Sequence, residues 1–300
     1  MTQLGEVISV SLMQDIDQEC PFKLESTKNP SIQKEGIAKD DRPAAIREQN
    51  NNGGTLGQNL GKECPAGWGA PDTLNEFHQP PEAPPYPRLD SKTDPSRHVK
   101  VKDEPYPYKV AAHHLIPGEA SLAKSDLYKK YMVKDAEGTT PKGKKYKIQA
   151  NIGYNVNGNH NGVWLPGNYG IRGSTSPKKG SSWRKIVVDP SYEDWCWAYM
   201  MECVRVAGGQ FHDSHTAYSE AVKDVLDNMY VRVDAHQDTE CPDCKDKSEV
   251  HPPYGLKRKL YRLSRFLRGK LRSRPGQWKA PWYTSDRFRE QMTRHGLLHE

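Results

Sequence analysis

The stretch Ala111-Ala112-His113-His114-Leu115-Ile116-Pro117 places two adjacent histidines at the end of a short apolar run. A second pair follows in Phe211-His212-Asp213-Ser214-His215, and Asn161-Gly162 lies between the two pairs. One imidazole can bind a divalent cation while its neighbour takes a proton from water, and metal-assisted phosphodiester hydrolysis needs both. The order His-His, Asn, His therefore indicates a nuclease site built around one metal ion.

The composition limits the classes of protein to which the chain can belong. It has 300 residues, a net charge of +6 and a hydrophobic fraction of 35%, low enough to predict that part of the chain adds little to a core. Six cysteines are too few for a disulfide scaffold and suit a reducing cytosol. No apolar run approaches the roughly 18 residues of a membrane span.

The first residues contain no basic segment followed by an apolar one, so we expect no secretory signal. This predicts synthesis in the cytoplasm and excludes routine export through a signal peptide. Delivery by a specialised secretion machine that reads a different signal stays open.

Three regions follow from the distribution of residues that break regular structure. From Lys28 to Lys100 the chain is polar and rich in Pro, Gly and Asn, which do not sustain a helix or a central strand. We expect residues 1–100 to form an irregular arm or linker. The stretch from about Lys28 to Lys100 should be dispensable for catalysis and serve delivery or contact with a secretion carrier or chaperone. Residues 101–235 should form the catalytic domain, and 236–300 a basic C-terminal extension.

Periodicity and capping residues predict a mixture of strands and helices. The predicted strands are 108–113, 144–156 and 163–165, and the predicted helices are 122–132, 190–207, one capped by Asp213 or Ser214, and 256–271. Asp189 and Pro190 begin the second of these helices, and Gly208 ends it. The pattern predicts an α+β fold.

The two histidine pairs can belong to one site if the helix near the second pair begins no later than His212. Residues three apart lie on the same side of a helical turn, so the rings of His212 and His215 converge if the helix begins by His212. The alternative is that both are ordinary residues at a helix start. We favour the site because all four histidines lie at the ends of predicted elements, where functional groups are commonly placed.

Nine Lys or Arg residues surround the predicted helix 256–271, with no acid among them. Its five leucines form one narrow stripe, so the cationic side chains bind a nucleic-acid backbone, contact a membrane surface or form a solvated face. The candidate phosphate-binding residues are Lys257, Arg258, Arg262, Arg265 and Arg268. Just beyond them, Trp278, Trp282 and Tyr283 either stack on bases or pack in a core.

Cys241-Pro242-Asp243-Cys244 is a single CxxC motif. With His236 before it and His251 after it, the motif could form a Cys2His2 zinc site. The sequence contains no second CxxC to strengthen this interpretation. We therefore favour an ordinary loop over a zinc site, and a zinc site over a redox role.

Three motifs together resemble one nuclease family. They are Tyr108-Lys109-Val110-Ala111-Ala112-His113-His114-Leu115-Ile116-Pro117, Asn161-Gly162-Val163-Trp164-Leu165-Pro166 and His212-Asp213-Ser214-His215-Thr216-Ala217-Tyr218. In this order they resemble the AHH family of the HNH/endonuclease VII superfamily of ββα-metal nucleases, between residues 106 and 230. That family is found largely as toxin domains of bacterial polymorphic toxin, contact-dependent and type VI secretion systems.

The resemblance implies a role for each candidate residue. His113, His212 and His215 would bind a divalent ion, with Mg²⁺, Zn²⁺ and Ni²⁺ as candidates. His114 would be the general base and Asn161 would orient it, so turnover should depend on Asn161 without a large loss of fold. The alternative is that Asn161 only makes a turn.

The expected architecture is a small ββα-metal core with a helical insertion, an irregular N-terminal arm and a basic C-terminal helix. The expected function is that of a metal-dependent endonuclease acting as an antibacterial toxin, with nucleic acid (DNA favoured) as substrate and a cognate immunity protein as partner. The rival function is that of a non-enzymatic nucleic-acid-binding or adaptor protein that uses the basic helix and the CxxC motif. Metal-dependent cleavage of a plasmid separates the two.

Overall fold

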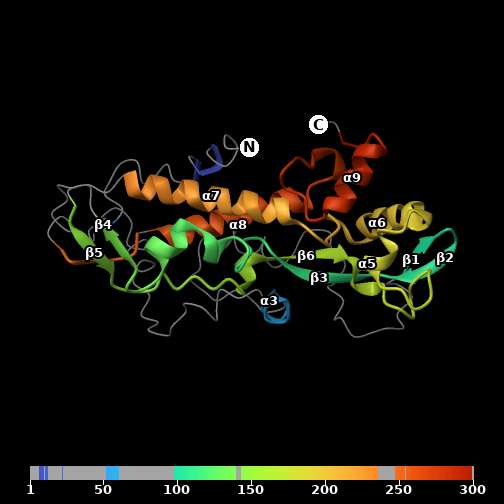
Figure 1. Cartoon of the computed structure of the whole chain (residues 1–300), viewed down its shortest axis with the longest axis horizontal. Helices are drawn as coiled ribbons and strands as arrows, with labels where there is room; N and C mark the ends of the chain where they lie inside the picture. Colours follow the sequence, from blue (N-terminus) through green and yellow to red (C-terminus); the bar gives the residue numbers. More distant parts are fainter. Residues whose placement is uncertain are drawn as a thin grey trace. The chain divides into compact units, whose positions relative to one another are not determined.

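The computed structural model describes residues 7–9, 11–12, 22, 52–60, 98–139, 143–235, 247–253 and 255–298. The chain forms two compact units, each assembled from segments that are distant in sequence. The first unit comprises Met1–Asn52, Ile116–Asn161 and Ser219–Phe266, and the second comprises Gly53–Leu115, Gly162–Tyr218 and Leu267–Glu300. Both units contain helices and strands, so the expectation of an α+β fold is confirmed (Figure 1).

A two-stranded antiparallel ribbon lies within the second unit. β3 (Lys109–His114) pairs with β6 (Gly162–Gly167), and the register sets Lys109 opposite Gly167 and His114 opposite Gly162. Both strands fall where the sequence predicted them, although β6 extends further at each end. A second ribbon pairs β1 (His98–Val101) with β2 (Glu104–Pro107).

Helix α6 (Glu193–Ala207) is the core helix that the capping residues predicted, and it follows the short helix α5 (Trp183–Ile186). A 3₁₀ turn (Pro190–Tyr192) precedes α6, and the Asp189 carboxylate accepts a hydrogen bond from the Ser191 backbone N–H at 3.1 Å. Gly208 ends the helix with a φ of 72°, a conformation that favours glycine. The buried face of α6 contains Trp195, Cys196, Tyr199, Met200, Cys203 and Val204.

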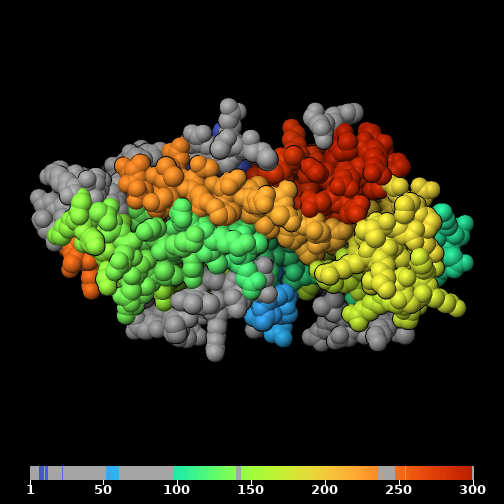
Figure 2. Space-filling model, viewed as in Figure 1, coloured from blue at the N-terminus to red at the C-terminus, as the bar shows by residue number. Residues whose placement is uncertain are grey.

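The C-terminal segment packs on α6 through α9 (Asp286–Arg294) and the aromatic residues before it, as Figure 2 shows at the surface. The Gln291 side-chain amide donates a hydrogen bond to the Glu193 carboxylate at 2.7 Å. Trp278, Trp282 and Tyr283 are buried. Of the two interpretations of these aromatic residues, packing is therefore the one that the structure supports.

Helix α3 (Gly53–Leu60) lies in the stretch expected to be an irregular arm. It packs on β3 and β6, which leaves Leu56 with 0% exposure and buries Leu60. A Cβ on Gly162 would lie 2.8 Å from the Leu56 side chain, so glycine at the start of β6 lets α3 pack this closely on the ribbon. A fragment beginning near Ser96 would lose α3, which argues against treating the whole arm as dispensable. Most of the arm lies outside the described residues.

In the first unit, three strands form a sheet in the order β4, β5, β7. β4 (Glu137–Thr139) is antiparallel to β5 (Lys145–Ile148), and β7 (Glu249–Val250) is parallel to β5. The strand predicted at 144–156 is thus much shorter than expected. Ile152, Tyr154 and Val156 are buried outside any strand, which explains why this stretch looked strand-like.

The helix predicted at 122–132 divides into a 3₁₀ turn (Leu122–Lys124) and a π-helix (Tyr128–Met132). Ser125 lies between them. Its hydroxyl donates to the Leu122 carbonyl at 2.7 Å and accepts from the Tyr128 N–H at 3.2 Å. A serine that bonds the backbone on both sides competes with a continuous helix, which is the physical reason for the division.

α7 (Thr216–Ala235) and α8 (Leu256–Arg272) each contribute residues to both units. All five leucines of α8 are 0% exposed, so the leucine stripe packs inward. Two of its cationic residues are also buried: Lys259 donates to the Leu12 carbonyl at 2.9 Å, and Arg268 donates to the Gly162 carbonyl. Among the described residues, no helix is long and apolar enough to span a membrane.

Truncating Leu56 tests whether α3 belongs to the folded second unit. Leu56→Ala should lower the free energy of unfolding by about 2–5 kcal/mol, because it leaves a cavity between α3 and the ribbon. Urea denaturation of the full chain measures this. Gln58→Ala on the exposed side of the same helix is the matched control and should change stability by less than about 0.5 kcal/mol. Equal stability of the two variants would contradict this placement of α3.

Candidate metal centre

His113 occupies the second-last position of β3, opposite Val163. Its side chain is only 3% exposed. Its Nε2 atom is buried and has no hydrogen-bond partner among the described residues. A buried polar atom without a partner is costly, which indicates a ligand at this position.

His212 and His215 lie in the segment before α7, which begins only at Thr216. The expectation that a helix already begun at His212 aligns the two rings is therefore wrong. The His212 N–H instead donates to the Pro166 carbonyl at 2.7 Å, next to an isolated bridge between His212 and Gly167. This backbone contact ties the segment to β6.

The segment that holds both histidines is also fixed from its other side. The Asp213 N–H donates to the Thr284 carbonyl at 3.0 Å, and the Asp286 N–H donates to the Ser214 carbonyl at 2.9 Å. The chain just before α9 thus binds the loop through its backbone. Long-range contacts, rather than helical spacing, determine where the two rings lie.

His113, His212 and His215 converge on one point. Each can offer one ring nitrogen such that the three atoms lie within 4.8 Å of one another, and no other such group occurs in the described part of the chain. The distances between ring centroids are 4.8 Å from His113 to His212, 5.0 Å from His113 to His215 and 5.1 Å from His212 to His215. The structure therefore brings together the three residues predicted as metal ligands.

Burial keeps these imidazoles neutral. It lowers the pKa of His113 well below the ordinary value, and positive charge on His212, His215 or His114 would lower it further. Burial, with His215 and His114 nearby, lowers the pKa of His212 to about 3. Burial also lowers the pKa of His215, against the opposing effect of its own backbone and of acidic neighbours. Neutral imidazole is the form that binds a metal ion.

The donor set fits a divalent transition-metal ion. Imidazole nitrogen suits Zn²⁺ and Ni²⁺, whereas Mg²⁺ prefers oxygen ligands. Three protein ligands with a fourth position left for water or substrate are typical of catalytic zinc sites. The partnerless Nε2 of His113 and the three neutral rings meet these requirements.

Two tyrosines that the sequence reasoning did not select contact the histidines. Tyr218 is completely buried, and its ring lies 5.3 Å from that of His113, while its hydroxyl donates to the Leu115 carbonyl at 2.6 Å. The Tyr169 hydroxyl lies 3.3 Å from Nδ1 of His212. Tyr218 follows His215 by three residues, which is a usable signal at a helix start, but no local pattern points to Tyr169.

Asn161 lies in the first unit, where both polar atoms of its side-chain amide have hydrogen-bond partners. Nδ2 donates to the carbonyls of Ile116 and Val156, both at 2.9 Å. Oδ1 accepts from the Ile116 N–H at 2.8 Å and from the Ser264 hydroxyl at 3.2 Å. Asn161 therefore anchors the chain two residues after His114. This role is more than making a turn. Contrary to the expectation of little loss of fold, the four hydrogen bonds predict that replacing Asn161 destabilises the protein.

His114 lies next to His113 on β3 and is buried, but it is not part of the three-histidine group. Successive side chains on a strand point to opposite faces, which separates the two adjacent imidazoles. His160, the residue before Asn161, packs against Tyr261 at a ring-centroid distance of 4.3 Å.

The zinc interpretation of the CxxC motif involves Cys241, Cys244 and His236, which lie outside the described residues. His251 is described and is half-buried. Burial and Lys247 lower the pKa of His251.

The candidate phosphate-binding residues of α8 do not share one environment. Arg262 and Arg265 are exposed, and Lys257 and Arg258 are half-buried. Arg268 is buried against the Gly162 carbonyl, so its role in the structure is to pair with a strand end and not to form a surface.

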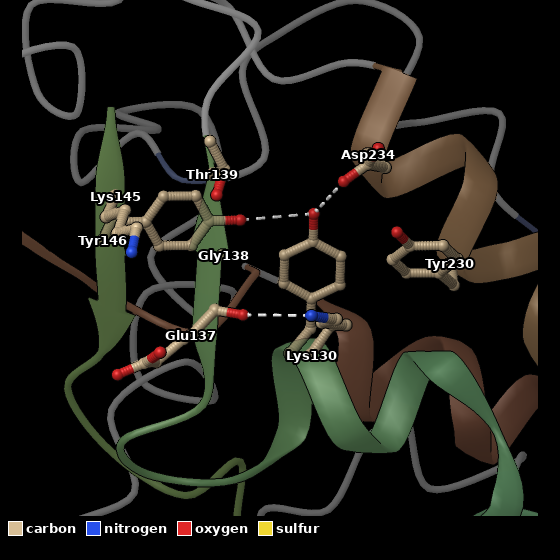
Figure 3. Close-up of a pocket in the computed structure, with 9 residues that line it drawn as sticks. Lys130, Glu137, Gly138, Thr139, Lys145, Tyr146, Tyr230 and Asp234 are labelled. Atoms are coloured by element: carbon tan, nitrogen blue, oxygen red, sulfur yellow. Dashed lines mark hydrogen bonds between the residues drawn. The ribbon is translucent and has the colours of Figure 1, made fainter. Parts of the chain in front are cut away.

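A cavity of about 350 Å³ in the first unit contains no histidine or cysteine (Figure 3). Two of its three phenol groups are paired: Tyr146 donates to Tyr131 at 3.4 Å, and Tyr131 donates to the Asp234 carboxylate at 2.8 Å. The Lys130 ammonium donates to the Glu137 carbonyl at 3.4 Å. These contacts form a hydrogen-bonded polar network, and the described residues that line it do not include a group of three side chains that could hold a metal ion.

The mixed fold and the histidine cluster are consistent with an HNH-like nuclease domain. The chain belongs to the AHH family, a nuclease family of the HNH/ENDO VII superfamily with conserved AHH, whose sequence model matches residues 96–247, half of the chain. The matched segment contains Ala112-His113-His114 and all three members of the histidine cluster. Neither the curated proteins nor the solved structures contain a match to the chain.

Removing single members of the cluster tests whether it binds metal. His113→Ala and His215→Ala should each weaken Zn²⁺ affinity by at least about 100-fold, because each removes one of three ligands. Calorimetric titration of the metal-free full chain measures the affinity. His295→Ala, which removes an exposed imidazole stacked on Trp197, is the matched control and should bind Zn²⁺ as the wild type does. Unchanged affinity in both cluster variants would refute the single-site arrangement.

Asn161→Asp tests the anchoring role. The new carboxylate oxygen would face the carbonyls of Ile116 and Val156 without a proton to donate, inside a site with no exposure. Each buried hydrogen bond lost costs about 1–3 kcal/mol, so denaturant titration should show a loss of several kcal/mol in the free energy of unfolding. Asn228→Asp, at a solvent-facing contact with the Asp224 carbonyl, is the control. If both variants are equally stable, Asn161 is not an anchor.

Proposed function

We propose that the chain is a metal-dependent endonuclease in which His113, His212 and His215 hold one divalent cation and His114 is the general base. The observation that carries this proposal is the convergence of three neutral imidazoles within 4.8 Å, in a member of a nuclease family. β3, β6 and the first turn of α7 would then be the ββα-metal core. The donor set favours Zn²⁺ or Ni²⁺ over Mg²⁺.

A bound divalent cation would supply Lewis-acid polarisation of the phosphodiester and stabilise charge on the leaving oxygen. The protein's own part begins with His114, which takes a proton from the attacking water. Histidine is the side chain most often used for such a proton transfer. Asn161 holds the backbone beyond His114 at Ile116 and thereby limits the movement of the strand end that carries the base.

Nucleic acid is the substrate that the proposal requires, and DNA is the favoured one. The exposed guanidinium groups of Arg262 and Arg265 support it, because cationic side chains attract phosphate regardless of base sequence. α8 contains no acidic residue that would oppose this attraction.

The biological role that we propose is that of an antibacterial toxin, which rests on the occurrence of AHH domains in bacterial toxin systems. The toxin would be made in the cytoplasm and delivered into a target cell by a specialised secretion system, with a carrier or chaperone bound to part of the N-terminal arm. A cognate immunity protein would protect the producing cell. Intoxication of neighbouring cells lacking that protein tests this role.

His114→Ala separates the base from the ligands. Plasmid cleavage should fall by roughly 10²–10⁴-fold, which is the usual contribution of a general base. Zn²⁺ affinity should stay close to that of the wild type, because His114 is outside the ligand group. His295→Ala again serves as the control and should cleave normally.

Two outcomes would count against the proposal. Cleavage by His114→Ala at nearly the wild-type rate would exclude His114 as the base. Cleavage by the wild type that persists after exhaustive chelation would exclude dependence on a metal ion.

A further inference from the structure

Tyr169 lies beside the metal centre, in the 3₁₀ turn Asn168–Gly170 that follows β6 directly. Its hydroxyl oxygen is 3.3 Å from Nδ1 of His212. The two rings are stacked, with an interplanar angle of 17° and a centroid distance of 6.0 Å. The contact therefore involves both the ring face and the polar end of the tyrosine.

Two glycines make room for this arrangement. A Cβ on Gly167 would lie 2.7 Å from the His212 carbonyl oxygen and 2.9 Å from the Tyr169 ring, so Gly167 lets both residues approach the same point of the strand. A Cβ on Gly170 would lie 2.2 Å from the Pro107 carbonyl oxygen. The backbone on either side of Tyr169 is thus held in close contacts that only glycine permits.

The chemistry of a neutral imidazole explains what the Tyr169 hydroxyl can do beside His212. The ring has one N–H and one lone pair, and the partner of one nitrogen decides what the other can do. With Nδ1 bonded to Tyr169, Nε2 is the nitrogen of His212 that remains for a metal ion. Histidine ligands usually donate their second ring N–H to an oxygen acceptor, which fixes both the tautomer and the orientation of the ring.

We propose that Tyr169 is a positioning residue of the metal centre: its hydroxyl oxygen accepts the Nδ1–H of His212 and so directs the Nε2 lone pair toward His113 and His215. This inference rests on the proposed metal-dependent function and adds to it the residue that sets the His212 tautomer. A tyrosine hydroxyl can also donate, so the contact persists when the ring carries its proton on Nε2.

The partial exposure of Tyr169 allows the inference to be tested by a small change. Its side chain is 43% exposed. Tyr169→Phe removes only the hydroxyl, keeps the stacked ring and should leave the melting temperature of the metal-free protein unchanged.

The first measurement is calorimetric titration of the metal-free full chain with Zn²⁺. Tyr169→Phe should bind Zn²⁺ about 10–100-fold more weakly than the wild type, the usual effect of losing the second partner of a histidine ligand. Tyr192→Phe removes a hydroxyl from a half-buried tyrosine of the same unit that packs against Lys178, and it should bind as the wild type does. Equal Zn²⁺ affinity in Tyr169→Phe and the wild type would overturn the inference.

The second measurement repeats the titration in a His212→Ala background. Tyr169→Phe should have no further effect on the residual Zn²⁺ affinity there, because no ring is left to orient. A further loss of the same size would show that the hydroxyl acts independently of His212, which also overturns the inference. A wild-type protein that binds no divalent ion would instead refute the proposed function itself, so the two failures are distinguishable.

Discussion

The pairing of β3 with β6 is the constraint on which the rest of the candidate site depends. It presents His113 at the end of one strand, and it offers the Pro166 carbonyl and Gly167 on the other as the attachment point for the His212 segment. α3 packs on the same ribbon, and Arg268 binds the carbonyl at the start of β6. A two-stranded ribbon is marginal by itself, so these additions are what make it a rigid support for the three histidines.

Local sequence signals were sufficient for the strand that ends at the adjacent histidines and for α6, because an apolar run and a capped helix are determined by neighbouring residues. They were also sufficient to select His113, His212 and His215. The predicted reason for the convergence of His212 and His215 was wrong, because α7 begins after both residues. The hydrogen bond from His212 to Pro166, which holds this segment, has no local sequence signature.

Tertiary contacts also explain two other differences from the expected fold. α3 contains three glycines in eight residues and has little intrinsic tendency to be helical, so the burial of Leu56 and Leu60 must stabilise it. On α8, charge patterning could not distinguish the exposed Arg262 from the buried Arg268, because the difference depends on a carbonyl supplied by a distant strand. Tyr169 was missed for the same reason.

The helix α3 lies outside the segment by which the family is recognised. That segment runs from residue 96 to residue 247, yet the ribbon inside it is covered by residues 53–60, and the histidine loop is bonded to Thr284 and Asp286 beyond its other end. The segment that matches the family and the residues that pack together as a folded unit therefore differ in this chain. A fragment cut at the family boundaries would expose the apolar strand surface that α3 covers and would lose the hydrogen bonds that hold the loop with His212 and His215. A failure of such a fragment to fold would therefore say nothing about the chemistry of the intact chain.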